Sequence, residues 1–246
     1  MKKSFPVVVL FAVFLSMVFV GYKVSAGSGA DAYKKADLKT GGLLYDKWFK
    51  LTGSKPEGTH PAYPAEGKQS GDSTWRCKEC HGWDYIGKDG RYKSGSHYTG
   101  IPGLLDSRDK SPEALYAALS GSPHGFSGQI DENSLWALVK FIKEGQMDVR
   151  PYLDVSGGAK GSAVTGKDLY EKNCQKCHGV DGNTLDFNAK KDGVQGIGFL
   201  ANDNPQESLH KIRWGHPGSK MPSMITEANL SDQETVDILA YSQTLE

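Results

Sequence analysis

The pattern Cys-x-x-Cys-His occurs twice in this chain, and no other feature limits its fold so strongly. The copies lie at residues 77–81 and 174–178, and together they contain all four cysteines. Two thiols on one helical turn form thioethers with the two vinyl groups of a porphyrin, and the adjoining histidine binds its iron. Each copy therefore predicts one covalently attached haem. The predicted attachment residues are Cys77, Cys80, Cys174 and Cys177, and the predicted iron ligands beside them are His81 and His178.

Zinc is the main alternative, because two Cys-x-x-Cys pairs can in principle close one tetrahedral site. The long separation between Cys80 and Cys174 argues against a zinc ribbon, whose pairs lie closer in sequence. Zinc also leaves the histidine after each pair unexplained. Haem is the preferred interpretation.

The N-terminus has the composition of a secretory signal. Lys2 and Lys3 precede an apolar run over residues 5–20, and Val-Ser-Ala ends at Ala26. Residues 1–26 are therefore predicted to direct export to the periplasm or another extracytoplasmic space. The alternative is an uncleaved membrane anchor, since the run is only slightly shorter than the ~20 residues that span a bilayer.

Composition limits the remaining function classes. Hydrophobic residues make up 38% and charged residues 24% of the chain, as in a soluble globular protein. The 29 basic and 29 acidic side chains cancel, so the charge excess typical of a nucleic-acid-binding protein is absent. No nucleic-acid partner is expected, and a membrane is expected only if the N-terminal segment is retained.

An internal repeat predicts two modules. Gly166, Leu169 and Tyr170 precede the second motif, and residues 41, 44 and 45 repeat the same three residue types at the same spacing. The predicted division is an N-terminal domain at 27–155, a glycine-rich linker at 156–165 and a C-terminal domain at 166–246. An insert near 51–74, rich in Gly, Pro and Ser, is predicted to be a surface loop.

Each module is expected to end in an amphipathic helix. In the second, Ser231 and Glu234 are spaced as a capping box. In the first, a helix is expected to start near Asp131, with its apolar face packed on the helix that contains Tyr45. The residues of that apolar face are Leu135, Leu138, Val139 and Ile142.

The sixth iron ligand of each haem separates electron transfer from chemistry on a bound molecule. In the second module Met221, within Lys-Met-Pro, is the predicted ligand; Met224 is the local alternative. The first module has no methionine at the matching position. His124 lies 43 residues after His81, the separation that also joins His178 to Met221, so His124 is predicted to be its ligand. The alternatives are His97, His60, Met147 or an open site.

These motifs resemble the two-domain, dihaem class I cytochrome c family over nearly all of the mature chain. The resemblance implies an all-α fold of two tandem class I cytochrome c-type domains, each wrapped around one covalently bound haem with an exposed edge. It also implies that the Pro102 carbonyl accepts the Nδ1 proton of His81. Gly198 replaces the corresponding proline in the second module, which leaves that hydrogen bond unassigned.

The predicted function is that of an exported electron carrier, not an enzyme, which relays single electrons between a donor and an acceptor redox protein. His/His ligation predicts a lower potential for the first haem than His/Met ligation for the second. Two alternatives stay open. One is a haem enzyme or ligand-binding protein with an open site on haem 1, and the other is an electron-transfer subunit of a larger dehydrogenase or oxidase complex.

Overall fold

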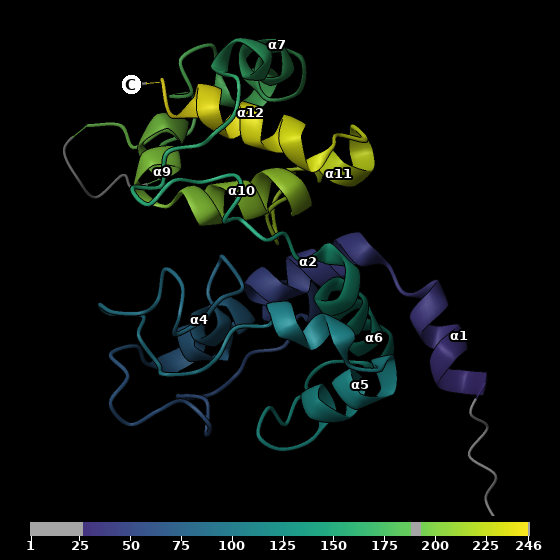
Figure 1. Ribbon diagram of the computed structural model, residues 1–246. Helices are drawn as coiled ribbons and strands as arrows, with labels where there is room; N and C mark the ends of the chain where they lie inside the picture. Colours follow the sequence, from purple (N-terminus) through teal and green to yellow (C-terminus); the bar gives the residue numbers. More distant parts are fainter. Residues whose placement is uncertain (1–26, 188–192, 246) are drawn as a thin grey trace, which may run out of the picture.

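Helices joined by irregular segments make up the molecule (Figure 1). The computed structural model describes residues 27–187 and 193–245, and within these ranges strand pairing is limited to isolated bridges such as Gly87–Pro102. This agrees with the predicted all-α class. The predicted export signal, residues 1–26, lies outside the described residues. Over the described ranges, no helix is both long and apolar enough to cross a membrane.

The elements vary widely in length. The α-helices are α1 (Gly27–Lys35), α2 (Leu38–Lys47), α3 (Phe49–Thr52), α4 (Cys77–His81), α5 (Pro112–Ser120), α6 (Glu132–Lys140), α7 (Ala163–Asn173), α8 (Gln175–His178), α9 (Ile197–Asp203), α10 (Pro205–Trp214), α11 (Met224–Glu227) and α12 (Asp232–Ser242). The other helical turns are η1 (Gly71–Trp75) and η2 (Leu105–Asp109), both 3-10, and the π-helical turn η3 (Phe141–Gly145).

Local capping explains where the two terminal helices begin. The Ser231 hydroxyl accepts from the Glu234 backbone N–H, and the Glu234 carboxylate accepts from the Ser231 N–H, so the predicted capping box of α12 is confirmed. Helix α6 starts directly after Asp131, whose carboxylate accepts from the Ser134 N–H at 3.0 Å. The predicted helix start near Asp131 is also confirmed.

Two helix crossings use the glycines of the sequence repeat. Helix α2 packs on α6, and α7 packs on α12 in the other group of helices in Figure 1. A Cβ on Gly41 would collide with the Ala137 carbonyl oxygen, and a Cβ on Gly166 would collide with that of Asp237. Each glycine therefore permits close backbone contact at its crossing. The repeated sequence positions have the same structural role in both halves.

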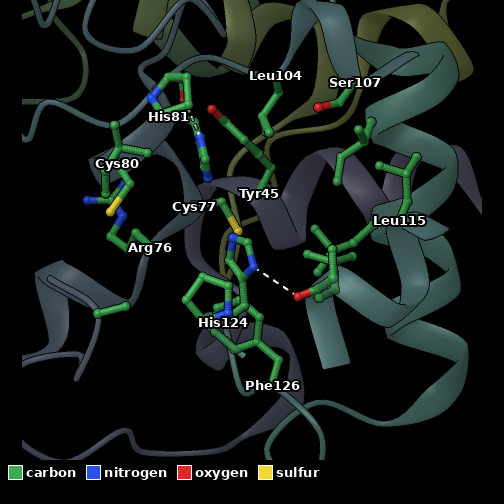
Figure 2. Close-up of a pocket in the computed structure, with 18 of the residues that line it drawn as sticks. Tyr45, Arg76, Cys77, Cys80, His81, Leu104, Ser107, Leu115, His124 and Phe126 are labelled. Carbon is green, nitrogen blue, oxygen red and sulfur yellow. Dashed lines mark hydrogen bonds between the residues drawn. The ribbon is translucent and has the colours of Figure 1, made fainter. Parts of the chain in front are cut away.

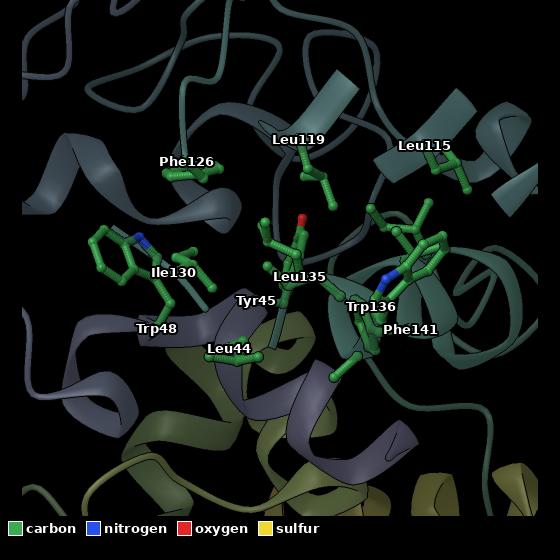
Figure 3. Close-up of a cluster of buried hydrophobic side chains, with 14 of the residues drawn as sticks. Leu44, Tyr45, Trp48, Leu115, Leu119, Phe126, Ile130, Leu135, Trp136 and Phe141 are labelled. Carbon is green, nitrogen blue, oxygen red and sulfur yellow. The ribbon is translucent and has the colours of Figure 1, made fainter. Parts of the chain in front are cut away.

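Two hydrophobic clusters underlie these groups of helices. The first contains side chains of α2, α5 and α6, among them Leu44, Tyr45 and the predicted apolar face of α6 (Figure 3). The second contains side chains of α10 and α12, but also Met147 and Leu153 from the segment before the predicted linker. Conversely, Trp214 of α10 packs in the first cluster. The halves therefore share a packed interface.

Two predicted segments differ in detail from the structure. Helix α7 already begins at Ala163, inside the predicted linker 156–165, because Ser162 caps it by accepting from the Thr165 N–H. The insert is irregular between α3 and η1, as predicted for a loop. It does more than cover the surface, however, because His60, Ala62 and Thr74 line an internal cavity.

Candidate haem sites

The first Cys-x-x-Cys-His motif forms the short helix α4 and lines a cavity of about 460 Å³. Gly82 ends the helix at φ 79°, and its N–H donates to the Lys78 carbonyl. Burial raises the pKa of Cys77 and of Cys80 to about 12, so both side chains are neutral thiols at physiological pH. The rest of the lining is mainly apolar, including Leu115, Phe126 and other hydrophobic residues.

His81 is held in the tautomer that a metal requires. Its Nδ1 donates to the Pro102 carbonyl at 2.8 Å, and an isolated bridge pairs Pro102 with Gly87. Burial lowers the pKa of His81 to about 4, so the ring is neutral and Nε2 keeps its lone pair. The contact that the family resemblance implied for Pro102 is present.

His124 faces His81 across the same cavity (Figure 2). The ring centroids lie 6.0 Å apart with 31° between the planes. A metal bound between two imidazoles at about 2 Å from each nitrogen places the ring centres roughly 6 Å apart. The Nδ1 of His124 donates to the Ala118 carbonyl at 2.9 Å, which leaves its Nε2 available. Histidine ligands usually donate their second ring N–H in this way.

The other predicted alternatives lie in different surroundings. His97 donates from Nδ1 to the Glu79 carboxylate at 2.7 Å and stacks on Tyr92. Met147 is buried in the second hydrophobic cluster. His60 does line the first cavity, but its Nε2 lies 3.0 Å from the carbonyl oxygen of His124. Nothing in the local sequence of His60 indicates this contact with His124.

The second motif lines a separate cavity of about 710 Å³. Cys174, Cys177 and His178 lie on its wall, and Met221 and Met224 lie there too. Met224 is buried in the second hydrophobic cluster, whereas Met221 is half-buried. Because the two cysteine pairs line different cavities, they do not meet in a shared zinc site.

The second histidine lacks the support that His81 has. Within the described residues, the buried Nδ1 of His178 has no hydrogen-bond partner. Gly198, which replaces the proline, lies inside α9, and its carbonyl accepts from the Asn202 side chain at 2.9 Å. The departure seen in the sequence therefore corresponds to a real difference between the sites.

Contacts around the two motifs are otherwise repeated. The Tyr45 hydroxyl donates to the Gly82 carbonyl at 2.5 Å, and the Tyr170 hydroxyl donates to that of Gly179 at 3.0 Å. The carbonyl of each motif histidine accepts from a following backbone N–H, at 3.0 Å for His81 and 3.1 Å for His178. The repeated tyrosine thus anchors the turn that follows each motif.

A buried carboxylate joins the walls of the two cavities. Asp46 on α2 accepts from Arg76, which lines the first cavity, and from Lys211 at 2.8 Å, which lines the second. Burial raises the pKa of Asp46, but the charges of Lys211 and Arg76 outweigh burial and lower it to about 2.

Nearby, the Tyr85 hydroxyl lies 2.7 Å from Nδ1 of His210, whose Nε2 donates to the Gly42 carbonyl at 3.0 Å.

The donor sets fit covalently attached haem. In each cavity two thiols and a histidine lie against a mainly apolar wall, and in the first a second imidazole stands at the spacing that one iron requires.

Comparison with known proteins supports a cytochrome c assignment for the C-terminal part of the chain. Residues 161–241 match the family model described as cytochrome C oxidase, cbb3-type, subunit III. The matched segment includes the second motif and Met221, and it implies covalently bound haem c and an electron-transfer role. A search of the curated proteins found no match to the chain.

Proposed function

We propose that this protein is an exported dihaem cytochrome c that passes single electrons between a donor and an acceptor redox protein. The observation that carries this proposal is that His81 and His124 face each other in the N-terminal half, which the family model does not match. This pair gives the N-terminal half a second candidate haem site, beside the one expected within residues 161–241. Haem iron supplies a reversible one-electron change between its ferric and ferrous states.

Each half of the chain would hold one haem. Cys77 and Cys80 would attach the first, and His81 and His124 would bind its iron. For the second, Cys174 and Cys177 would attach the haem, and His178 and Met221 would bind its iron. With a side chain on each side of each iron, no position on either haem would be open to a substrate, which favours a carrier over an enzyme.

The residues of the two sites favour electron flow from the first haem to the second. Paired imidazoles set a lower potential than His/Met ligation. The Pro102 carbonyl adds to this difference, since it makes the His81 ring more basic, whereas His178 lacks such a partner among the described residues. Asp46 pairs with Arg76 on the wall of the first cavity and with Lys211 on the wall of the second, so these three side chains connect the two walls.

The matched family model favours a second candidate. Its description names an oxidase subunit, so this chain could serve as the electron-transfer subunit of a membrane oxidase, anchored through residues 1–26. The N-terminal sequence of the purified native protein separates the candidates. A start after Ala26 supports the exported carrier, and a retained N-terminus together with co-purifying oxidase subunits supports the second candidate.

Carbon monoxide tests the proposed coordination, because it binds reduced iron only where the sixth position is open or labile. We expect a haem assay to give two haems per chain and the reduced visible spectrum to remain unchanged under CO. A CO-induced change that amounts to one haem would contradict two stable axial pairs and move a ligand-binding role to the front. One haem per chain would overturn the dihaem proposal.

A further inference from the structure

The insert between α3 and η1 places one histidine directly behind the proposed ligand His124. The backbone N–H of His60 donates to the Thr74 hydroxyl at 2.9 Å. Its ring Nδ1 accepts from the Ala62 N–H at 3.1 Å. Because a backbone N–H is always a donor, Nδ1 is an acceptor and the proton of the neutral ring is on Nε2. His60 therefore donates from Nε2 to the His124 carbonyl at 3.0 Å.

Aromatic packing fixes the orientation of the His60 ring. The ring lies 4.4 Å from Trp75 and 5.9 Å from Phe126, measured between centroids. Trp75 is itself held from the insert, since its indole N–H donates to the Gly58 carbonyl at 3.0 Å. Packing and hydrogen bonds thus hold the half-buried donor, although the segment has no regular secondary structure.

Several contacts hold the loop that carries His124, among them the Gly125 N–H on the Gly121 carbonyl at 2.7 Å and the Ser54 hydroxyl on the Gln129 carbonyl at 3.0 Å. The loop joins α5 to α6, and Gly125 follows His124 at φ 64°. The His124 ring is held by the Ala118 carbonyl, and the Phe126 N–H donates to the Leu119 carbonyl at 3.1 Å. Both bonds lead back to α5. Among the described residues, the hydrogen bond from His60 is the one that ties the backbone of His124 itself to the insert.

We propose that His60 is a positioning residue which holds the His124 loop closed over haem 1, so that the insert serves to keep the sixth ligand on the iron. This inference rests on the proposed role of His124 as that ligand. A positioning role for His60 explains why the insert is found in the N-terminal half, where the proposed sixth ligand is a histidine and not a methionine. In the second half, Met221 follows a short turn in which its own N–H donates to the Ser219 hydroxyl at 3.1 Å.

The test uses the haem-loaded chain with two substitutions at one position. His60→Phe keeps an aromatic ring against Trp75 and Phe126 but removes the donor, whereas His60→Gln keeps a side-chain N–H. Carbon monoxide traps reduced haem 1 whenever His124 leaves the iron. The trapping rate, measured in guanidinium below the unfolding range, therefore reports how often the loop opens.

We expect His60→Phe to keep the low-spin spectrum and to raise the trapping rate roughly five-fold, the factor that corresponds to one ordinary hydrogen bond. The His60→Gln rate should stay within about two-fold of the native rate, because the amide can still donate. His97→Gln is the matched control, since His97 contacts Glu79 and not the His124 loop. An unchanged rate in His60→Phe would overturn the proposal.

Failure of the underlying coordination gives a different result. His124→Ala should convert haem 1 to a high-spin form that binds CO without delay. If His124→Ala retains the native spectrum, His124 is not the ligand. If both His60 variants become high-spin while His124→Ala does not, His60 is itself the ligand and its positioning role is wrong. Unfolding curves followed by circular dichroism show whether the folds of the variants are intact.

Discussion

The two cavities begin from the same motif and differ in what surrounds it. In the first, two histidines face each other, and each donates its Nδ1 proton to a backbone carbonyl. In the second, His178 has no such partner among the described residues, and methionines line the cavity. The same Cys-x-x-Cys-His motif thus gives two different sites, because different residues surround it. Loops distant from the motif therefore supply the groups that would tune each proposed haem.

Replacing His124 should have the largest effect on the difference between the two sites. In His124→Met, haem 1 gains the ligand pair proposed for haem 2, so its midpoint potential should rise by on the order of a hundred millivolts, within the ~0.8 V range that axial ligands span. The two waves of a potentiometric titration should then move together. Spectra of the ferric protein check that the introduced methionine binds the iron, and unmoved waves would contradict His124 as the ligand.

The corresponding test in the second cavity removes its proposed methionine ligand. Met221→Ala should open haem 2 to CO, and the visible spectrum of the reduced protein should change by one haem. Met224→Leu is the control, because a volume-conserving change in the second hydrophobic cluster costs less than ~1.5 kcal/mol and leaves the ligand in place. CO binding by the Met224 variant in place of the Met221 variant would reverse the assignment.

Acid should weaken the contact that joins the cavities. The pKa of Asp46 is about 2 in the folded protein against 3.8 for the free side chain, so its ionised form stabilises the fold. This stabilisation, about 2 kcal/mol, is present above pH ~4 and is lost as the pH falls through about 2. Guanidinium unfolding between pH 5 and 2 measures it.

Asp46→Asn removes that pH dependence and should lower the free energy of unfolding at pH 7 by roughly 3 kcal/mol, since Arg76 and Lys211 lose their shared partner. Asp148→Asn is a suitable control, because Asp148 pairs with the exposed Arg150. Equal acid slopes in the native chain and in Asp46→Asn would show that Asp46 does not supply the stabilisation.

Pro102→Ala should give the smallest effect. The acceptor for His81 is the backbone carbonyl, which alanine retains, so the low-spin spectrum should persist. Freer backbone motion should weaken the hydrogen bond slightly and raise the haem 1 potential by much less than His124→Met does. A shift as large as that of His124→Met would show that the proline ring itself contributes to the site.

Much of the fold follows from local sequence. The capping box at Ser231 and the helix start at Asp131 were predictable, because a cap and its partner lie within three residues. The glycine and tyrosine of each module were predictable as a repeat, but not their roles at a helix crossing and a turn. The insert has no regular secondary structure between α3 and η1, and its composition gave no sign that it lines the cavity.

The sequence alone was enough to predict the features that depend on neighbouring residues, namely the two Cys-x-x-Cys-His motifs, whose side chains each line one cavity, and the helix caps. Residues on one helical turn meet whatever the rest of the chain does. The tertiary structure alone brought His124 to 6.0 Å from His81, His60 behind His124, and Lys211 onto Asp46. Contacts over such sequence separations depend on how whole helices and loops pack, and burial then decides which polar groups pair.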